Sequence, residues 1–584
     1  MCGIVGVCGD NACERVFNGL KSLEYRGYDS WGIASLSDGL ILLNKTVGKI
    51  SDASKPANDC SIAVGHTRWA THGKVTNKNA HPHLSNDKSI AVVHNGIVEN
   101  YSELRKMLEK KGFSFESETD TEIIPNLIQL KISEGADFIE AVRKSLLEIE
   151  GSYAIVVLKK DSFEMVGARN GSPLVIGVGK ESNFFASDVP AFLEYTNQVI
   201  YLEDYEMAVL TNNTIKIILV NDGSEIKRVA EKINWSPEQA QKGNFEHFTL
   251  KEITEQKETI EKAAKQPTET FDKVTEMIRN AKGVFFVGCG TSYHACISSS
   301  YIFSRVTKMH VNVVLASEFR NYTEFLNSDS LVIAVSQSGE TADLIDAIKA
   351  AKEKEAKIVS IVNVMGSSIM RLSNESLLMN AGPEICVLST KSYTSQLVIL
   401  LLLAYSVAGK YSEGKLLIEK TVQKIPSLID SNIVSLRELA VKLRDSKDIF
   451  LIGRDLAYPT AMEAALKIKE VSYIHAEAFA GGELKHGTIA LIEENTPVIS
   501  FATERTRKLI VSNAQETKSR GAFIIGVDSE ENEIYDFFIK VPALENANPI
   551  AMIIPIQILS YYLALEKKLD PDKPRNLAKS VTVK

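Results

Sequence analysis

An internal repeat restricts the fold of this 584-residue chain more than any other feature of its sequence. An apolar run ending in glycine, an acidic residue about thirty positions further on and a second apolar run all recur at one separation of 165 residues. The corresponding positions are Gly288 and Gly453, Glu318 and Glu483, and Val335 and Ser500. Landmarks that recur at one separation indicate a duplicated structural unit.

The first copy of the repeat alternates between buried strands and helices. Val284–Val287 and Leu331–Val335 each lead into a turn rich in Gly, Ser and Thr, and Lys357–Val364 is a third apolar strand. A helical pattern over Asp343–Lys354 lies between the second and third strands. Strands that alternate with helices predict a doubly wound parallel α/β sheet, and the duplication predicts two of them.

The chain before the repeat has a different pattern of predicted strands and helices. Short β-type runs are interrupted by helical patterns over Cys13–Leu23, Ser102–Lys111 and Thr121–Ser133. The β-type runs are Gly32–Leu36, Ser61–Gly65, Ser89–Val93, Tyr153–Leu158 and Leu174–Val178. This order predicts an α+β domain in which sheets carry helices on their outer faces.

These patterns of predicted secondary structure divide the chain into five segments. A polar stretch over residues 221–255 reads as a linker. We therefore expect a first domain at 1–220, a linker and connecting helix at 221–274, repeat domains at 275–415 and 440–574, and a tail at 575–584.

Charge and composition exclude some classes of partner. The net charge of −8 argues against a nucleic-acid backbone, which selects basic surfaces. The longest apolar run that we find, Leu397–Ala408, is too short to cross a bilayer. The N-terminus has no secretory pattern, and seven cysteines without a CxxC pair predict free thiols in a reducing cytoplasm.

Cys2 is the first candidate for chemistry. After removal of the initiator Met, its α-amine would lie beside its own thiol and could act as a base. An amide-cleaving thiolate also needs an oxyanion hole, and Asn95-Gly96 offers a side-chain amide and a backbone N–H. Arg68 and Asp120 have the charges that an amino-acid substrate requires. Taken singly, a small buried cysteine and a favourable Asn-Gly turn explain the same residues.

Two turns in the first repeat are candidates for binding a phosphate group. Gly288-Cys-Gly-Thr-Ser and Ser336-Gln-Ser-Gly-Glu-Thr fall where a strand leads into a helix, and helix N-termini attract anions. Well-capped helices would look similar. We find no Walker motif and no strong dinucleotide fingerprint, so nucleotide-driven chemistry is not expected.

The motifs of the first part resemble those of class II glutamine amidotransferases, which are N-terminal-nucleophile hydrolases with an αββα sandwich. The motifs begin at Cys2 (Cys-Gly-Ile-Val-Gly), Glu24 (Glu-Tyr-Arg-Gly-Tyr-Asp-Ser), Gly65 (Gly-His-Thr-Arg-Trp-Ala-Thr-His-Gly), His94 (His-Asn-Gly-Ile) and Ser117 (Ser-Glu-Thr-Asp-Thr-Glu). The resemblance makes Cys2 the nucleophile and Asn95 with Gly96 the oxyanion hole. It implies a glutamine site of Arg68, Trp69, Thr71, His72, Gly96 and Asp120.

The repeats resemble sugar isomerase (SIS) domains, and the whole chain resembles amidotransferases that make glucosamine 6-phosphate from fructose 6-phosphate and glutamine. The motifs that carry the second resemblance begin at Ala465 (Ala-Leu-Lys-Ile-Lys-Glu), Gly482 (Gly-Glu-Leu-Lys-His-Gly) and Pro574 (Pro-Arg-Asn-Leu-Ala-Lys-Ser-Val-Thr-Val). The implied contacts with the sugar phosphate are Thr291, Ser292, Ser336, Gln337, Ser338, Thr341, Val387, Ser389 and Ala578.

The same resemblance implies the catalytic groups of the sugar half. Lys579 would form a Schiff base with the open-chain ketose, and Glu470, with Lys467 nearby, would move a proton between C1 and C2. His486 would open the sugar ring across a homodimer interface. No cofactor is implied. The five histidines between His66 and His94 could suggest a metal, but a structural zinc site usually needs four convergent ligands, so no metal is expected.

The sequence departs from this family in places. Arg454-Asp-Leu-Ala, Thr488 and the final Lys584 replace more usual residues, and the polar stretch lacks a long insertion found in eukaryotic members. Two alternatives are open. A phosphosugar-binding regulator should carry a DNA-binding helix-turn-helix, and another class II amidotransferase should carry a pyrophosphate-sugar motif or an ATP-pyrophosphatase loop; we find none of these.

Overall fold

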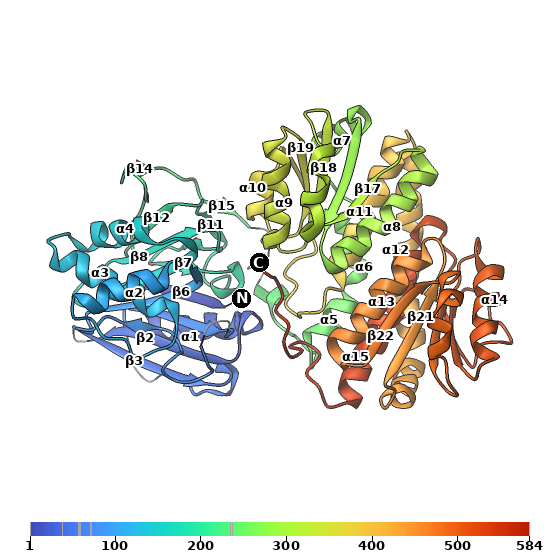
Figure 1. Cartoon of the computed structure of the whole chain (residues 1–584), viewed down its shortest axis with the longest axis horizontal. Coiled ribbons are helices and arrows are strands. Elements are labelled where there is room, and N and C mark those ends of the chain that lie inside the picture. The colour runs from blue at the N-terminus through green and yellow to red at the C-terminus, as the bar shows by residue number, and fades with distance from the viewer. Residues whose placement is uncertain are drawn as a thin grey trace. The chain divides into compact units, whose positions relative to one another are not determined.

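The computed structural model of the chain describes residues 2–37, 39–56, 60–70, 73–233, 235 and 237–582. The chain divides into two compact units (Figure 1). The first unit runs to Gln241 and also takes in the tail from Ala578, and the second runs from Lys242 to Leu577.

Two antiparallel sheets form the centre of the first unit. In sheet order, the eight-stranded sheet contains β15 (Glu231–Lys232), β11 (Gln198–Tyr201), β9 (Val175–Val178), β10 (Ser182–Ala186), β1 (Gly3–Gly9), β4 (Ile62–Arg68), β2 (Ser30–Ser37) and β3 (Leu40–Val47). The seven-stranded sheet contains β14 (Glu225–Ile226), β13 (Ile215–Leu219), β12 (Glu206–Leu210), β8 (Met165–Asn170), β7 (Gly151–Lys159), β6 (Ile90–Val98) and β5 (His83–Leu84).

Apolar side chains join these sheets into a sandwich. One buried cluster combines Ile4 and Val64 of the eight-stranded sheet with Val93 and Val156 of the seven-stranded sheet. Strand residues alternate between faces, so the other face of each sheet is left for helices. Helix α1 (Ala12–Ser22) packs on β1 and β4.

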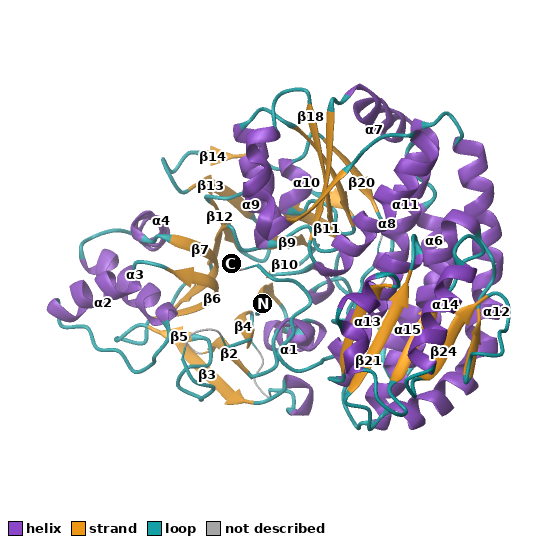
Figure 2. Cartoon of the chain, turned by 45° about the vertical axis from the view of Figure 1, so that its right-hand side comes forward, coloured by secondary structure: helices purple, strands orange, loops and turns teal. Residues whose placement is uncertain are grey.

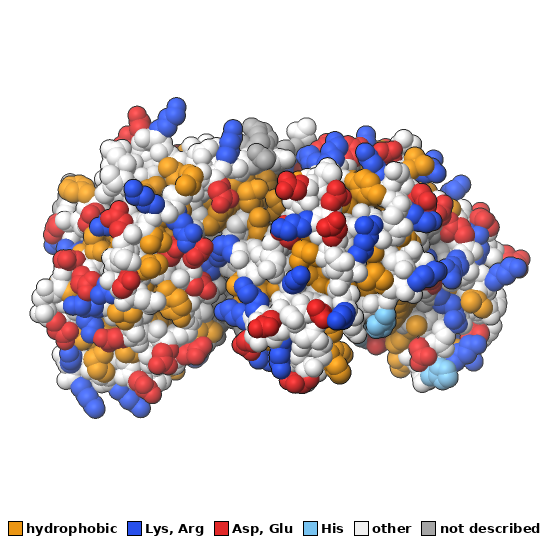
Figure 3. Space-filling model, turned by 90° about the horizontal axis from the view of Figure 1, so that it is seen from above, with side chains coloured by type: hydrophobic (Ala, Val, Ile, Leu, Met, Phe, Trp, Pro, Cys, Tyr) orange, Lys and Arg blue, Asp and Glu red, His pale blue; other side chains and the backbone are white. Residues whose placement is uncertain are grey.

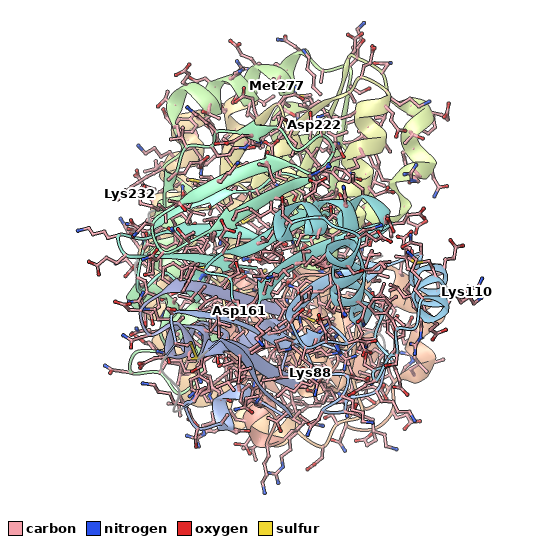
Figure 4. All side chains as sticks on the ribbon, turned by 90° about the vertical axis from the view of Figure 1, so that its left-hand side faces the viewer. Lys88, Lys110, Asp161, Asp222, Lys232 and Met277 are labelled. Atoms are coloured by element: carbon pink, nitrogen blue, oxygen red, sulfur yellow. A yellow bond between two sulfur atoms is a disulfide. The ribbon has the colours of Figure 1, made fainter. Side chains whose placement is uncertain are left out.

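Three further helices cover the seven-stranded sheet and bury their apolar stripes against it. They are α2 (Tyr101–Lys110), α3 (Ile123–Ser133) and α4 (Phe138–Glu148) (Figure 2). On the outer rim of this unit the side chains of Lys110 and Lys232 extend outward (Figure 4). The layers are helix, sheet, sheet, helix, which confirms the predicted αββα sandwich.

The second unit contains two five-stranded parallel sheets with the same strand order. The first contains β17 (Asn312–Leu315), β16 (Gly283–Gly288), β18 (Ser330–Ser336), β19 (Lys357–Val362) and β20 (Glu375–Leu378). The second contains β22 (His475–Ala480), β21 (Asp448–Gly453), β23 (Pro497–Phe501), β24 (Phe523–Asp528) and β25 (Phe537–Lys540). The predicted duplication is confirmed at the level of whole sheets.

Each parallel sheet has helices on both faces. In β16, Val284 and Phe286 point into one apolar cluster, and Phe285 and Val287 point into another. Helices α8 (Gly290–Thr307) and α11 (Lys391–Val407) belong to the first cluster, and α9 (Ala342–Glu353) belongs to the second. In the second sheet, α13 (Ala457–Ser472) and α15 (Asn548–Glu566) pack on one face and α14 (Arg507–Lys518) on the other. The predicted doubly wound α/β folds are confirmed.

The remaining helices also belong to the second unit. These are α5 (Phe248–Thr254), α6 (Gln256–Ala263), α7 (Thr268–Asn280), α10 (Ser368–Leu372) and the long α12 (Tyr411–Leu443). The stretch 221–274, for which we predict a linker and connecting helix, holds more structure than a linker. Strands β14 and β15 each pair with a sheet of the first unit, and α5, α6 and α7 belong to the second.

The expectation that no apolar segment is long enough to cross a bilayer is wrong. The helical segment Glu545–Glu566 has 22 residues and, by length and composition alone, could cross a bilayer. However, 89% of its apolar window is buried inside the protein, so it serves as a core helix. It is apolar all round because α12 and α13 both pack against it. Figure 3 shows Lys, Arg, Asp and Glu side chains interspersed on the visible face.

The expectation of free thiols is also wrong for two cysteines. Cys13 in α1 and Cys60 before β4 form a disulfide with a Cα–Cα distance of 5.9 Å, while the other five cysteines are free. The sequence does not reveal the pair, because residues 47 positions apart are brought together only when α1 packs on the sheet. A backbone hydrogen bond from Ala12 to the Cys60 carbonyl holds the same junction.

Candidate active site

The side chain of Cys2 lies at the start of β1, half-buried among backbone groups of neighbouring strands. The N–H of Trp69 donates to its Sγ at 3.1 Å. Burial raises the pKa of the Cys2 thiol, while this hydrogen bond and the charge of Arg68 act to lower it. The pKa is raised on balance, so a base is needed to form the thiolate. The α-amine of an N-terminal cysteine can supply that base.

Asn95 and Gly96 lie beside Cys2 in the second half of β6. The Asn95 amide Nδ2 donates to the carbonyl oxygen of Cys2 at 2.9 Å. Gly96 has a φ of 134°, and a Cβ there would meet the Ser152 oxygen at 2.0 Å, so only glycine fits. The structure thus brings the predicted nucleophile and the predicted oxyanion-hole residues together.

The predicted carboxylate and amine contacts for glutamine also lie near Cys2. Arg68 is buried at the end of β4, and its Nη1 and Nη2 donate to the carbonyls of Lys74 and Gly73 at 3.2 and 3.3 Å. Burial lowers the Arg68 pKa, and the neighbouring acidic groups of Cys2, Asp29 and Asp120 oppose this effect.

Asp120 is held by a backbone N–H and Trp69 by an aromatic side chain. Asp120 accepts a hydrogen bond from the Val98 N–H at 2.8 Å. Trp69 packs edge-to-face on Tyr28 with ring centroids 5.3 Å apart. Thr71 and His72, the two other residues predicted for the glutamine site, lie outside the described residues. Arg68 and Trp69 therefore lie close to Cys2, the predicted nucleophile, and Asp120 lies close to Arg68.

In the second unit, the predicted phosphate loop (residues 336–341) follows β18 and precedes α9. Ser336 Oγ accepts from the Gly339 N–H at 3.1 Å and lies 3.1 Å from Thr341 Oγ1. Ser338 Oγ accepts from the Glu340 N–H at 3.2 Å. The loop therefore gathers hydroxyls at the N-terminus of a twelve-residue helix, an arrangement that suits an anion.

Thr291 and Ser292 occupy the first turn of α8. Ser292 Oγ accepts from the Gln396 amide at 3.0 Å, and Thr291 Oγ1 donates to Glu463 Oε1 at 3.0 Å. Lys467 Nζ lies 3.0 Å from Thr291 Oγ1 and 3.4 Å from the carbonyl of Ser389. The structure thus joins the predicted sugar contacts Thr291 and Ser389 to the predicted Lys467.

Lys467 belongs to a buried charged group that we call the lysine cluster: Lys467, Glu463 and Glu470. Its Nζ is 3.1 Å from Glu463 Oε1 and 2.9 Å from Glu470 Oε2. Burial alone would lower the Lys467 pKa, but the two carboxylates outweigh it and raise the pKa. Burial acts to raise the Glu463 pKa, and Lys467 and His294 lower it on balance. Lys467 is therefore held as a cation.

The remaining residues predicted for the sugar site lie on several other segments of the chain. His486 is exposed in the 3-10 segment Glu483–His486, and no hydrogen bond or ion pair within the described ranges links it to the cluster. Ala578 and Lys579 group with the first unit. Val387 donates its N–H to the carbonyl of Asp572 at 3.1 Å and Gln337 follows Ser336 in the phosphate loop.

Sequence reasoning missed several residues that touch these sites. His294 Nδ1 is 2.8 Å from Glu463 Oε2, and the Ala70 N–H donates to Asp29 Oδ2 at 2.9 Å. Glu463 could have been found, because it lies four residues before Lys467, a spacing that brings two side chains together on one face of a helix. Of the residues described, no group of three or more His, Cys, Asp or Glu is placed to hold a metal ion.

Fold and sites together define a class of protein: a class II glutamine amidotransferase domain joined to two SIS domains. The glutamine amidotransferase domain family matches residues 66–194, and the SIS domain family matches 277–406 and 442–567. The chain is 46% identical to the glutamine–fructose-6-phosphate aminotransferase (isomerizing) of Pyrococcus horikoshii and 43% identical to that of Thermococcus kodakarensis, over 100% of both chains in each case.

Solved structures agree for the second half. The C-terminal domain of glucosamine-fructose-6-phosphate aminotransferase from Francisella tularensis is 30% identical, with a TM-score of 0.52 over 57% of this chain and 99% of that one. Tagatose-6-phosphate ketose/aldose isomerase from Escherichia coli, 18% identical with a TM-score of 0.50 over 57% and 96%, shares the fold. The chain belongs to the glutamine–fructose-6-phosphate aminotransferase (isomerizing) family.

Proposed function

We propose that this chain converts D-fructose 6-phosphate and L-glutamine into D-glucosamine 6-phosphate and L-glutamate. In the first half-reaction, the Cys2 thiolate attacks the side-chain amide carbon of glutamine. The carbonyl oxygen becomes an oxyanion that Asn95 Nδ2 and the Gly96 N–H stabilise. The C–N bond then breaks, ammonia leaves, and water hydrolyses the thioester to glutamate.

Arg68 and Asp120 hold the amino-acid end of glutamine in this proposal. The guanidinium of Arg68 pairs with the α-carboxylate and Asp120 with the α-ammonium group, since each supplies the opposite charge in a buried setting. The hydrogen bonds that Arg68 now gives to Gly73 and Lys74 tie it to the loop after β4. Trp69, Thr71 and His72 complete the glutamine site.

The phosphate group of the sugar binds at the N-termini of α8 and α9. Hydroxyls and backbone N–H groups there favour a dianion. The residues proposed for this contact are Thr291, Ser292, Ser336, Gln337, Ser338 and Thr341, with Val387, Ser389 and Ala578 on the sugar.

The second half-reaction takes place on the sugar carbonyl. His486, supplied by the second copy in a homodimer, opens the ring. Lys579 condenses with the C2 ketone and releases water, and ammonia then displaces the lysine from the imine. Glu470 carries a proton from C1 to C2, which yields the amino aldose. Lys467, held as a cation beside Glu470, stabilises the carboxylate form of that base.

One observation supports this proposal most strongly: a cysteine at position 2 whose sulfur and carbonyl are both engaged by the predicted Trp69 and Asn95. The test is to mix the protein with glutamine and fructose 6-phosphate and to detect glucosamine 6-phosphate by mass. Cys2→Ala should stop glutamate release and still isomerise fructose 6-phosphate. Glutamate without amino sugar from the parent protein would show that the acceptor is wrong.

The proposal includes a cytoplasmic location and no nucleic-acid or membrane partner. Free thiols are one reason to expect a reducing compartment. The Cys13–Cys60 disulfide weakens that reason, although the other five cysteines are free. The domain limits 1–220, 275–415 and 440–574 also remain proposals.

A further inference from the structure

We propose that His66 is the positioning residue that orients the Asn95 amide in the oxyanion hole. This inference rests on the proposed glutaminase function of Cys2 and adds a residue to it. His66 lies in β4 and Asn95 in β6, on facing sheets of the first unit, and the His66 side chain is fully buried.

The hydrogen bonds of His66 define which ring nitrogen carries the proton. Its Nε2 is 3.1 Å from the backbone carbonyl of His94 and 3.0 Å from Asn95 Oδ1. A backbone carbonyl can only accept, so Nε2 must carry a hydrogen. That hydrogen is shared between the two oxygens, and the side of the Asn95 amide that faces His66 is its oxygen.

The hydrogen on His66 Nε2 determines the orientation of the Asn95 amide. With Oδ1 toward His66, Nδ2 must face Cys2, where it donates to the Cys2 carbonyl at 2.9 Å. The opposite orientation would bring two donors together at His66 and would direct an oxygen toward the developing oxyanion. An oxyanion hole acts through donors that are oriented before the reaction, and His66 supplies that orientation.

His66 keeps this role over a wide pH range. Burial lowers its pKa to about 3, although the Asn95 hydrogen bond acts in the opposite direction. The ring is therefore neutral, with Nε2 protonated and Nδ1 not. Nδ1 has no hydrogen-bond partner among the residues that the structure describes. The ring packs on His81 with centroids 4.2 Å apart, so its polar contacts are those to His94 and Asn95.

The test uses a matched pair of variants in the full-length protein. His66→Gln places an amide donor near the Nε2 position, and His66→Met has similar size and no donor. The Met variant should lose about 10²-fold to 10³-fold in glutaminase kcat, as expected when an oxyanion donor is lost, with KM for glutamine nearly unchanged. The Gln variant should recover most of kcat.

The rate at which iodoacetamide alkylates Cys2 distinguishes a misoriented Asn95 amide from a general loss of structure at the site. This reaction displaces iodide and forms no oxyanion, so its rate should be the same in the Met variant and the parent. His83→Phe is a control, because it removes the hydrogen bond between His83 and Thr119 in the same histidine group and leaves Asn95 untouched. Its kcat should stay at the parent value.

A double-mutant cycle completes the test. In an Asn95→Ala background, His66→Met should cost almost nothing further in kcat, since the group that it orients is gone. Any one of three results would overturn the inference. The Met variant could keep the kcat of the parent, its alkylation rate could fall as far as its kcat, or its effect could add fully to that of Asn95→Ala. If the Met variant does not fold, loss of kcat in a folded Gln variant overturns it. No glutamate release by the parent protein would instead refute the proposed function.

Discussion

Cys2 and Lys467, one in each candidate site, differ in how their surroundings stabilise a charge. The Cys2 thiol has a raised pKa and one backbone donor at its sulfur, so forming its anion requires a base. Lys467 is fully buried, but two carboxylates stabilise its charge. The raised pKa keeps the Cys2 thiol neutral at rest, whereas the two carboxylates keep Lys467 charged.

The lysine cluster leads to a prediction about stability. Glu463→Gln should destabilise the protein by about 3–5 kcal/mol, because it removes one partner of a buried ion pair. The shift in the urea midpoint of unfolding measures the loss. Glu258→Gln is the matched control: Glu258 forms an exposed i,i+4 contact with Lys262, and its loss should cost about 0.5 kcal/mol or less. Equal effects of the two substitutions would contradict the prediction.

The same pair predicts a dependence on pH. The pKa of Glu463 is lower in the folded protein than the ordinary value of about 4.3. Its contribution to stability is therefore present above that value and is lost as pH falls through the folded pKa. Lys467 has a raised pKa, so its contribution is present at neutral pH and is lost only at strongly alkaline pH. Unfolding measured from pH 3 to 7 should show a weaker pH dependence in Glu463→Gln.

Lys579 supports a prediction about covalent chemistry. Lys579→Arg keeps a positive charge but cannot form an imine with a ketose, so isomerase and synthase activities should both fall to background. Glutamine hydrolysis should remain, because its chemistry uses Cys2. Borohydride reduction with fructose 6-phosphate should add a hexitol phosphate to the peptide containing Lys579, as read by mass spectrometry. Parent-level glucosamine 6-phosphate from the Arg variant would make Lys579 structural.

At the scale of elements, the disulfide joins α1 to the segment directly before β4, the strand that carries His66 and Arg68. Cross-linking residues 47 positions apart stabilises a fold by about 4 kcal/mol in the chain-entropy model. Reduction, or Cys13→Ser, should therefore lower the unfolding temperature of the oxidised protein, as followed by calorimetry. A thiol titration in guanidinium should find five thiols before reduction and seven after it. Seven before reduction would show that the pair is not formed.

Elements with a strong period were predictable from the sequence. The predicted helices at Cys13–Leu23 and Asp343–Lys354 lie within one residue of α1 and α9. The edge strand β3 was missed, because its side chains are mostly exposed and its run of leucines does not alternate. The core helix Glu545–Glu566 was missed because a helix packed on all sides has no polar face.

The candidate sites were predictable to the extent that motifs carry them. Cys2, Asn95 and Gly96 are brought together as the motifs predict, and so are Thr291 and Lys467. His66 stands inside a quoted motif, yet its bond to Asn95 depends on two sheets facing each other. Contacts of that kind arise from tertiary packing, which local patterns do not record.

At the scale of the whole molecule, ammonia released at one site must be used at the other, and free ammonia would waste glutamine. We therefore predict that fructose 6-phosphate promotes glutamine binding. Coupling between two sites is reciprocal, so each substrate should raise the affinity for the other by one common factor, of about 5-fold to 150-fold in typical systems.

A doubly substituted protein, Cys2→Ala with Lys579→Arg, makes this coupling measurable at equilibrium because neither substrate turns over. Calorimetric titration should give the dissociation constant of glutamine with and without fructose 6-phosphate, and the converse. Inorganic phosphate in place of the sugar is the control, since it should bind at the proposed phosphate loop and has no carbonyl to engage. Two equal factors above one would establish energetic coupling between the units. Factors of one in both directions would mean that ammonia transfer relies on a physical route alone, with no thermodynamic link between the sites.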